Sequence, residues 1–493
     1  MKHCTPEEIG LSSAAVLAFY REMEENGMST HAVLMARGDR IFSECYYAPF
    51  HKDLKHRMYS VSKTFVSVAV GFCEQDGLLS LDEPMVKYFP EYLNAYSDSR
   101  VTDTTIREML QMESSMESSV NWFRTGTDDR REVYFRKHSD KYAGTLFHYD
   151  SPGSYMLGCI VERVTGKPFL EYLKEKVLLD IGFSEDAYCL QAPGGHSFGD
   201  SGVMCTPMDL LLFARFVLNM GTFEGKRYLN EAYLRAATTM SVSNNDYGFR
   251  YHDTYGYGYQ IWGAPKGCFA FLGMGTQVAV CDPKHDFIFV ITSDNQGHPS
   301  HYEYLYKALY RNIIDQLGDT DAPLPANPEA HRALTEFTAS QKLFSLPEST
   351  DTSFSREIDG RVYRAEGNPM GIKWFRLDFS ENGGTLTYEN ATGEKSFSFG
   401  LGYNVFGKFP EEGYSDRIAT VPCPGNRYDA AFSADFPEKR KLRIRVQIID
   451  KYFGNLAMVF GFCDRDHASV RMVKRAEAFL NEYEGIMNAE CVM

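Results

Sequence analysis

The stretch "YSVSKTF" places a serine hydroxyl, Ser60, three residues ahead of a lysine amine, Lys63. In a helix that begins at Ser60, side chains three residues apart lie on one face, so the amine can contact the hydroxyl. A serine becomes a strong nucleophile when a base accepts its proton, and lysine can be that base when burial lowers its pKa. The apolar residues that follow, "TFVSVAVGF", would supply the burial. The pattern therefore indicates acyl transfer through a covalent intermediate.

A lone Ser-x-x-Lys pattern occurs often by chance, and the serine then only caps a helix while the lysine faces solvent. Here the longer stretch "HRMYSVSKTFVSVAVGFCEQDGLLSLDEPMVKYFP" resembles the serine β-lactamase-like superfamily, in particular its branch of class C β-lactamases, esterases and D-aminopeptidases. Later segments of the superfamily are matched in the same order by "AGTLFHYDSPGSYMLGCIVERVTGKPF", "GDSGVMCTPMDLLLFARFVLNMG" and "YGYGYQIW". The resemblance covers most of residues 1–318 and implies a serine hydrolase that forms an acyl-enzyme.

The resemblance implies two further site residues, because Tyr149 and Ser151 fall at the positions of the family's Tyr-x-Asn or Tyr-x-Ser element. It implies that Tyr149 passes a proton to the departing group. Since a nearby ammonium favours the phenolate, we expect the Tyr149 hydroxyl to lose its proton more readily than a free phenol. Ser151 would hydrogen-bond Lys63, although it could instead form the turn before Pro152, and Tyr149 could be a core aromatic.

The third family motif is altered in this chain. The stretch "FAFLGMGTQVAV" has no Lys-Thr-Gly or His-x-Gly, and Phe271, Leu272 and Gly273 occupy the usual three positions. Gly273 would let a substrate backbone approach, and the N–H groups of Met274 and Ser60 would form an oxyanion hole; the plainer alternative is a strand with a glycine bulge. In relatives that recognise β-lactams this position helps to hold a carboxylate. We therefore expect weak β-lactamase activity and an amide, peptide or ester substrate with an apolar flank.

Two other motifs invite functional interpretations that we do not favour. Ser293, Asp294 and Asn295 spell the family's Ser-Asp-Asn triplet, but they lie downstream of every other element, so we expect no catalytic role. His298 and His301 have the spacing of two metal ligands on a helix face, but no third ligand is identifiable nearby, and we expect polar residues at a helix start. We expect neither a metal nor a cofactor.

The elements that must position these residues alternate between helix and strand up to residue 318. The pattern predicts a helix in "LSSAAVLAFYREMEENG", two strands in "HAVLMARGDRIFSECYY", a helix in "TPMDLLLFARFVLNMG" with Thr206 and Asp209 as its capping box, and two strands in "TQVAVCDP" and "DFIFVITS". Early and late strands with helices between them predict one sheet built from both ends. The expected class is α/β (α+β), with a β-lactamase/transpeptidase-like antiparallel sheet flanked by helices.

The sequence predicts two domains. Residues 1–318 would form the hydrolase domain, and 319–345, which contain "GDTDAPLPANPEAHRALTEF", would form a linker with a short helix. Residues 346–493 hold short strands separated by turns, which predict an antiparallel, lipocalin-like β-barrel. We expect this barrel domain to end in an amphipathic helix, "SVRMVKRAEAFLNEYEG". The region resembles barrel modules of some D-aminopeptidases and esterases, where such a domain limits substrate size or mediates dimerisation. The sequence does not choose between these roles, so a homodimer is one of the two possibilities.

The composition indicates which classes of partner and which cellular compartment to expect. The 493 residues carry 51 Lys and Arg against 66 Asp and Glu, a net charge of −15 that repels nucleic-acid phosphates and anionic lipid. No stretch approaches the roughly 18 apolar residues of a membrane span, and the start of the chain does not resemble a leader peptide. The eleven cysteines contain no Cys-x-x-Cys pair. We therefore expect a cytoplasmic protein with reduced thiols and a small acyl or peptide substrate, without nucleic-acid or membrane partners.

A hypothesis from another class is a binding or scaffold protein that keeps the penicillin-binding fold and has lost turnover. The altered third motif is its main support. The intact Ser60, Lys63 and Tyr149 favour the hydrolase.

Overall fold

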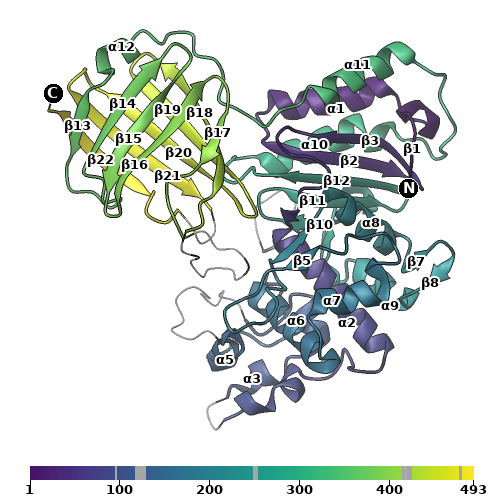
Figure 1. The fold of residues 1–493 in the computed structure, drawn as a ribbon. Helices are drawn as coiled ribbons and strands as arrows, with labels where there is room; N and C mark the ends of the chain where they lie inside the picture. The colour runs from purple at the N-terminus through teal and green to yellow at the C-terminus, as the bar shows by residue number, and fades with distance from the viewer. Residues whose placement is uncertain are drawn as a thin grey trace. The chain divides into compact units, whose positions relative to one another are not determined.

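A computed structural model describes residues 1–94, 97–116, 129–247, 254–413, 417, 423, 425–476 and 480–492. The chain divides into two compact units. Among the described residues, the first comprises Met1–Lys342 together with Arg417, and the second comprises the other residues from Leu343 onward (Figure 1). Among the described residues, no helix combines the length and the apolar character that a membrane crossing requires.

The first unit contains eleven α-helices and twelve strands among its described residues. The helices are α1 (Ser13–Glu25), α2 (Ser62–Gln75), α3 (Ser99–Thr102), α4 (Ile106–Leu110), α5 (Arg130–Arg136), α6 (Ser151–Thr165), α7 (Phe169–Leu173), α8 (Pro207–Leu218), α9 (Glu231–Thr238), α10 (His301–Asn312) and α11 (Pro328–Ala339). The strands are β1 (Lys2–His3), β2 (Thr30–Arg37), β3 (Arg40–Tyr46), β4 (His56–Arg57), β5 (Tyr188–Cys189), β6 (Val203–Cys205), β7 (Thr222–Phe223), β8 (Lys226–Arg227), β9 (Trp262–Gly263), β10 (Phe269–Gly273), β11 (Gln277–Asp282) and β12 (Phe287–Ser293).

The central sheet of the first unit joins the two ends of its sequence. Its strand order is β1-β3-β2-β12-β11-β10-β9, and all its pairings are antiparallel except that of β1 with β3. Strand β2 lies beside β12, with Val33 opposite Ile291 and Met35 opposite Phe289. The predicted sheet built from early and late strands is therefore confirmed.

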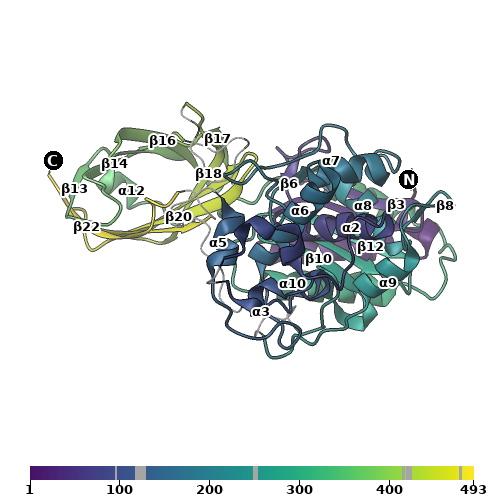
Figure 2. The same cartoon turned by 90° about the horizontal axis from the view of Figure 1, so that it is seen from below.

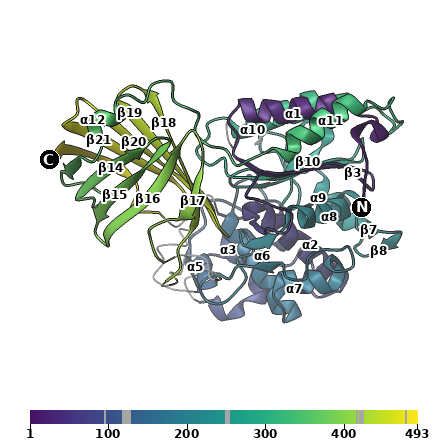
Figure 3. The ribbon, with the colours of Figure 1, turned by 45° about the horizontal axis from the view of Figure 1, so that its top comes forward.

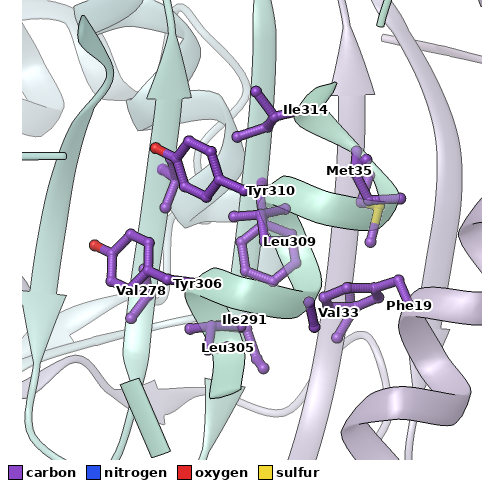
Figure 4. Close-up of a cluster of buried hydrophobic side chains, with 14 of the residues drawn as sticks. Phe19, Val33, Met35, Val278, Ile291, Leu305, Tyr306, Leu309, Tyr310 and Ile314 are labelled. Carbon is purple, nitrogen blue, oxygen red and sulfur yellow. The ribbon is translucent and has the colours of Figure 1, made fainter. Parts of the chain in front are cut away.

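One face of this sheet is covered by α1, α10 and α11 (Figure 3). Figure 4 shows the apolar layer between sheet and helices, in which Phe19 of α1 and Leu309 of α10 approach Val33 and Ile291. All four side chains are almost fully buried. The short helix expected in 319–345 is α11, which packs against α1 as part of the first unit.

The other face carries α2 and α8. Phe65 of α2 stacks on Phe213 of α8 with ring centroids 3.8 Å apart, and Phe213 lies 5.8 Å from Phe271 on β10. Helix α8 begins with the predicted capping box, in which Thr206 and Asp209 each accept a backbone N–H from the other. Helix α2 is thus packed against the sheet and α8 by aromatic rings, which holds its N-terminus beside the end of β10.

The second unit is a β-barrel, as predicted. It contains α12 (Ser355–Ile358) and strands β13 (Val362–Ala365), β14 (Trp374–Ser380), β15 (Gly383–Asn390), β16 (Gly393–Leu401), β17 (Val405–Lys408), β18 (Asp429–Glu438), β19 (Lys441–Ile449), β20 (Phe453–Phe462), β21 (His467–Arg475) and β22 (Gly485–Cys491). The strands follow the order β16-β15-β14-β13-β22-β21-β20-β19-β18, and a short parallel pairing of β16 with β18 closes the ring (Figure 2). Strand β17 pairs with β18 beside this closure.

The predicted closing helix is wrong. The stretch "SVRMVKRAEAFLNEYEG" continues β21 and then leads into β22, with residues 477–479 outside the described part of the chain. Buried and exposed residues alternate along β21, with Val470 and Met472 facing the core. β21 pairs with β20 and β22, and β22 also pairs with β13. Pairing within the barrel outweighs the helix propensity of the segment, because only these strands complete the ring.

A buried histidine four residues before Ser60 predicts acid sensitivity. His56 on β4 is fully buried near the rings of His31 and Phe50, and burial lowers the pKa of His56 from 6.5 to about 3. Between these values the unfolded chain binds a proton that the folded chain does not. The free energy of unfolding should therefore fall as the pH drops below 6.5, by up to about 1.4 kcal/mol per pH unit from this group.

Urea unfolding of the wild type and of His56→Asn at pH 7 and pH 5 measures this contribution. We expect the loss of stability between the two pH values to be smaller in His56→Asn by about 1–2 kcal/mol. An unchanged pH dependence in the variant would contradict the assignment.

Candidate active site

Ser60 and Lys63 lie together, as their spacing predicts. Ser60 is the middle residue of a single 3-10 turn, η2 (Tyr59–Val61), which leads directly into α2. Lys63 is 1% exposed, its Nζ lies 3.0 Å from Ser60 Oγ, and it donates a hydrogen bond of 2.7 Å to the carbonyl of Asp200. Ser60 itself is only half-buried. The arrangement is a partly accessible hydroxyl in contact with a buried amine.

The turn that carries Ser60 is held by a buried arginine. Arg57 donates from Nε to the Ser201 carbonyl and from Nη2 to Ser201 Oγ, both at 2.9 Å. Its guanidinium lies 4.4 Å from the centroid of the Tyr59 ring, a cation–π distance. Tyr59 has φ of 46°, a left-handed conformation that is uncommon for a bulky residue. Arg57 thus links this unusual turn to the segment that supplies the Asp200 carbonyl.

Tyr149 lies at the same place. The centroid of its ring is 5.0 Å from Lys63 Nζ, and the ring stacks on Trp262 at 5.3 Å. Desolvation of the hydroxyl raises the pKa of Tyr149 well above its ordinary value of 10, the Asp200 carboxylate raises it further, and a side-chain hydrogen bond with Ser60 partly opposes the rise. The expectation that Tyr149 loses its proton readily is therefore wrong, because desolvation dominates. The phenol is a neutral O–H, suited to donating a proton.

The residues on either side of Tyr149 are anchored to Met112, which has a left-handed φ of 58°. The carbonyl of Met112 accepts from the N–H of His148 at 2.8 Å, and its sulfur accepts from the N–H of Asp150 at 3.2 Å. The Asp150 carboxylate in turn accepts from Ser114 Oγ at 2.7 Å. These contacts fix the backbone around the phenol.

Ser151 is the first residue of α6 and is half-buried. Its predicted hydrogen bond with Lys63 stays a prediction. One turn along the helix, Ser154 is fully buried and donates to the side chain of Gln260. Gln260 lies within the stretch "YGYGYQIW", which sequence reasoning used only as a landmark.

Gly273 brings the end of β10 against the turn that carries Ser60. A Cβ at this position would collide with the carbonyl oxygen of Met58, so only glycine allows the approach. β10 and β11 pair in regular register up to Gly273 opposite Gln277, as in an ordinary strand end. Met274 follows and is 38% exposed. The oxyanion role of the Met274 N–H stays a prediction, and the strand places this residue next to the turn that carries Ser60.

The Ser-Asp-Asn triplet supports the turn after Gly273. Ser293 Oγ donates to the carbonyls of Gly275 at 3.0 Å and of Thr276 at 2.8 Å. The N–H of Asn295 donates to the Gly275 carbonyl at 3.1 Å. These contacts give the triplet a bracing role that its place in the sequence did not reveal.

The His-x-x-His pair makes contacts with backbone carbonyls. His298 Nε2 lies 2.9 Å from the Asn26 carbonyl, and His301 Nδ1 lies 2.8 Å from the His298 carbonyl. Within the described part of the chain, no group of three or more His, Cys, Asp and Glu could hold a metal ion.

An aromatic cluster borders Tyr149. The ring of Phe147 lies 5.0 Å from Tyr247, 5.1 Å from Tyr257 and 5.9 Å from Trp262, which stacks on Tyr149. Tyr247 is 37% exposed, so the cluster reaches the surface. Sequence reasoning missed these rings as site residues, because scattered aromatics carry no spacing signal.

Comparison with known proteins places this chain in a family. The family model described as Beta-lactamase matches residues 18–311, more than half of the chain. The chain belongs to the beta-lactamase family. The match to this serine hydrolase family includes Ser60, Lys63, Tyr149 and Gly273, and it ends before the barrel.

Individual relatives of this beta-lactamase family member are distant. A 6-aminohexanoate-dimer hydrolase of Paenarthrobacter ureafaciens is 26% identical over 284 residues, which cover 53% of this chain and 71% of the relative. A penicillin-binding protein homologue from Caulobacter crescentus has a TM-score of 0.52 at 15% identity and covers 64% of this chain and 99% of its own. The structure of SurE with D-Leu has a TM-score of 0.50 at 17% identity and covers 85% of this chain and 93% of its own. At these identities the structural likeness shows the fold alone.

The close approach at Gly273 gives a prediction. In Gly273→Ala the added methyl would push β10 away from the Met58 carbonyl and displace Ser60. We expect the rate of covalent labelling of Ser60 by a fluorophosphonate to fall by about 100-fold, since a shift of about 1 Å in a catalytic group has effects of that size.

Gly367→Ala is the matched control, because an added Cβ there would meet nothing within 4 Å. Melting temperatures of both variants would show whether they remain folded. Labelling of Gly273→Ala at the wild-type rate would contradict the inference that the close approach of β10 positions Ser60.

Proposed function

We propose that the protein is a serine hydrolase that forms an acyl-enzyme on Ser60 with a small amide, peptide or ester substrate. The observation that carries the proposal is the buried Lys63 amine, 3.0 Å from Ser60 Oγ and anchored to the Asp200 carbonyl. Burial of an amine disfavours its charged form, because desolvation penalises the charge. A neutral amine can take the serine proton.

In the proposed mechanism, Lys63 takes the proton of Ser60 and Tyr149 supplies a proton to the leaving group. A neutral Lys63 has two N–H bonds and one lone pair; one N–H donates to the Asp200 carbonyl and the lone pair accepts the proton of Ser60. Ser60 Oγ then bonds to the substrate carbonyl carbon, and the N–H groups of Ser60 and Met274 would stabilise the resulting oxyanion. Tyr149 donates its proton to the departing nitrogen or oxygen as the scissile bond breaks, and it regains a proton from Lys63. Water, deprotonated by the same groups, then hydrolyses the acyl ester.

Two observations support a substrate with an apolar flank. Phe271 is fully buried against Phe213, so it offers no cation for a substrate carboxylate, which also argues against strong β-lactamase activity. The rings of Phe147 and Tyr247 form an apolar border beside Tyr149. The similarity to a 6-aminohexanoate-dimer hydrolase favours an amide over an ester.

Ser60→Ala tests the proposal. We expect the wild type to be labelled by a fluorophosphonate and to hydrolyse at least one compound of a panel of p-nitrophenyl esters, D- and L-aminoacyl anilides and nitrocefin. Ser60→Ala should lose labelling and turnover. Ser67→Ala, which removes a hydroxyl further along the same helix, is the matched control and should keep both.

The same experiment tests the alternative, a binding or scaffold protein without turnover, which the loss of a polar third motif at Phe271 favours. A wild type that is neither labelled nor active would support that alternative. Equal activity in the wild type and Ser60→Ala would place the chemistry elsewhere.

Tyr149 gives a pH prediction. Because desolvation raises its pKa above 10, the phenol should remain protonated across neutral and moderately alkaline pH, so kcat/KM should not fall between about pH 8 and pH 10 through its ionisation. Tyr149→Phe should lower kcat for an anilide by about 10²- to 10⁴-fold, the usual size of general acid catalysis. An alkaline limb below pH 10 that disappears in Tyr149→Phe would contradict the assignment.

A further inference from the structure

Gln260 occupies an unusual position in the first unit. It is 2% exposed and has φ of 56°, in the left-handed region that non-glycine residues seldom adopt. It lies two residues before Trp262, whose ring stacks on Tyr149. A buried amide in this conformation needs contacts that compensate both the desolvation and the backbone strain.

The side chain of Gln260 joins two helices. Its Nε2 donates to the carbonyls of Met109 at 2.9 Å and Leu110 at 3.0 Å, at the C-terminal end of α4. Its Oε1 accepts from Ser154 Oγ on α6 at 2.6 Å. Both N–H donors and the carbonyl oxygen are therefore used, a combination that glutamate or a hydrocarbon side chain cannot provide.

The backbone of Gln260 contacts a third helix, α2, which follows Ser60 and carries Lys63. Its carbonyl accepts from Thr64 Oγ1 at 2.9 Å, and its N–H donates to the Leu110 carbonyl at 2.9 Å. Thr64 is adjacent to Lys63 on α2. Gln260 thus holds α2, α4 and α6 together through five hydrogen bonds.

These helices lead to both halves of the site. Helix α6 begins two residues after Tyr149, and α4 is followed by Met112, which anchors the N–H groups on either side of Tyr149. In helix α2, Thr64 directly follows Lys63. A change at Gln260 would therefore alter the separation between the Lys63 amine and the Tyr149 ring without touching either group.

We propose that Gln260 is a positioning residue that sets the Tyr149 phenol against the Ser60–Lys63 pair, and so controls protonation of the leaving group. The inference rests on the proposed hydrolase function. Its distinctive consequence concerns the leaving group. An anilide must receive a proton as it departs, whereas p-nitrophenolate departs without one, so a misplaced phenol should harm the anilide selectively.

The test compares kcat/KM for a p-nitroanilide and a p-nitrophenyl ester of the same acyl group. In Gln260→Ala we expect kcat for the anilide to fall at least about tenfold with KM little changed, because small displacements of a catalytic group are costly. Loss for the ester should stay below about threefold. Ser154→Ala, which removes the link of Gln260 to α6 and a longer contact of 3.3 Å with the Asp150 carbonyl, should show the same selectivity. This variant decides the matter if Gln260→Ala does not fold.

Tyr233→Phe is the matched control, since it removes a buried hydroxyl that contacts Ser67 on the same helix α2 without reaching Gln260. Its anilide-to-ester ratio should equal that of the wild type at a comparable drop in melting temperature. Equal losses for both substrates in the folded Gln260 or Ser154 variant, no loss in it, or the same selectivity in Tyr233→Phe would overturn the inference. A wild type without Ser60-dependent turnover of either substrate would instead refute the proposed function.

Discussion

The arrangement of the first unit depends on one buried contact, the Lys63 amine between Ser60 Oγ and the Asp200 carbonyl. Removing an ammonium from water is costly, so the site must either neutralise the amine or surround it with acceptors. The contact with the Asp200 carbonyl holds the amine beside Ser60 Oγ. The turn at Tyr59 and the segment at Asp200 must both be held rigidly for this, and the buried Arg57 connects them.

Several non-glycine residues with positive φ lie in the segments that surround this contact. Tyr59, Met112, Gln260 and Thr276 lie at the turn that carries Ser60, the Tyr149 anchor, the helix junction and the turn after Gly273. Such conformations persist only where neighbouring contacts compensate them. Each of these residues has such contacts, among them the Arg57 guanidinium, the N–H groups beside Tyr149, the amide bonds of Gln260 and the hydroxyl of Ser293. The site is thus held in shape before any substrate arrives.

At Phe271, in the third motif, an apolar side chain that packs in the core stands where a polar side chain was expected. The resemblance to β-lactam-recognising relatives predicts a polar group there, whereas Phe271 packs against Phe213 in the layer that also holds Phe65 of α2. Apolar packing of this kind stabilises the approach of β10 to the turn that carries Ser60. The same residue therefore strengthens the scaffold and offers no charge at this position.

The sequence by itself determined what depends on residues close together in the chain. The three-residue spacing of Ser60 and Lys63, the capping box of α8 and the alternation in most barrel strands are local patterns, and the structure contains all three. Only the tertiary structure decided the rest. Asp200 is 137 residues from Lys63, and Gln260 is 196 from Thr64, so no local pattern could reveal these contacts. The raised pKa of Tyr149 and the strand β21 in place of a helix have the same origin, because desolvation and strand pairing depend on what the folded chain brings near a residue.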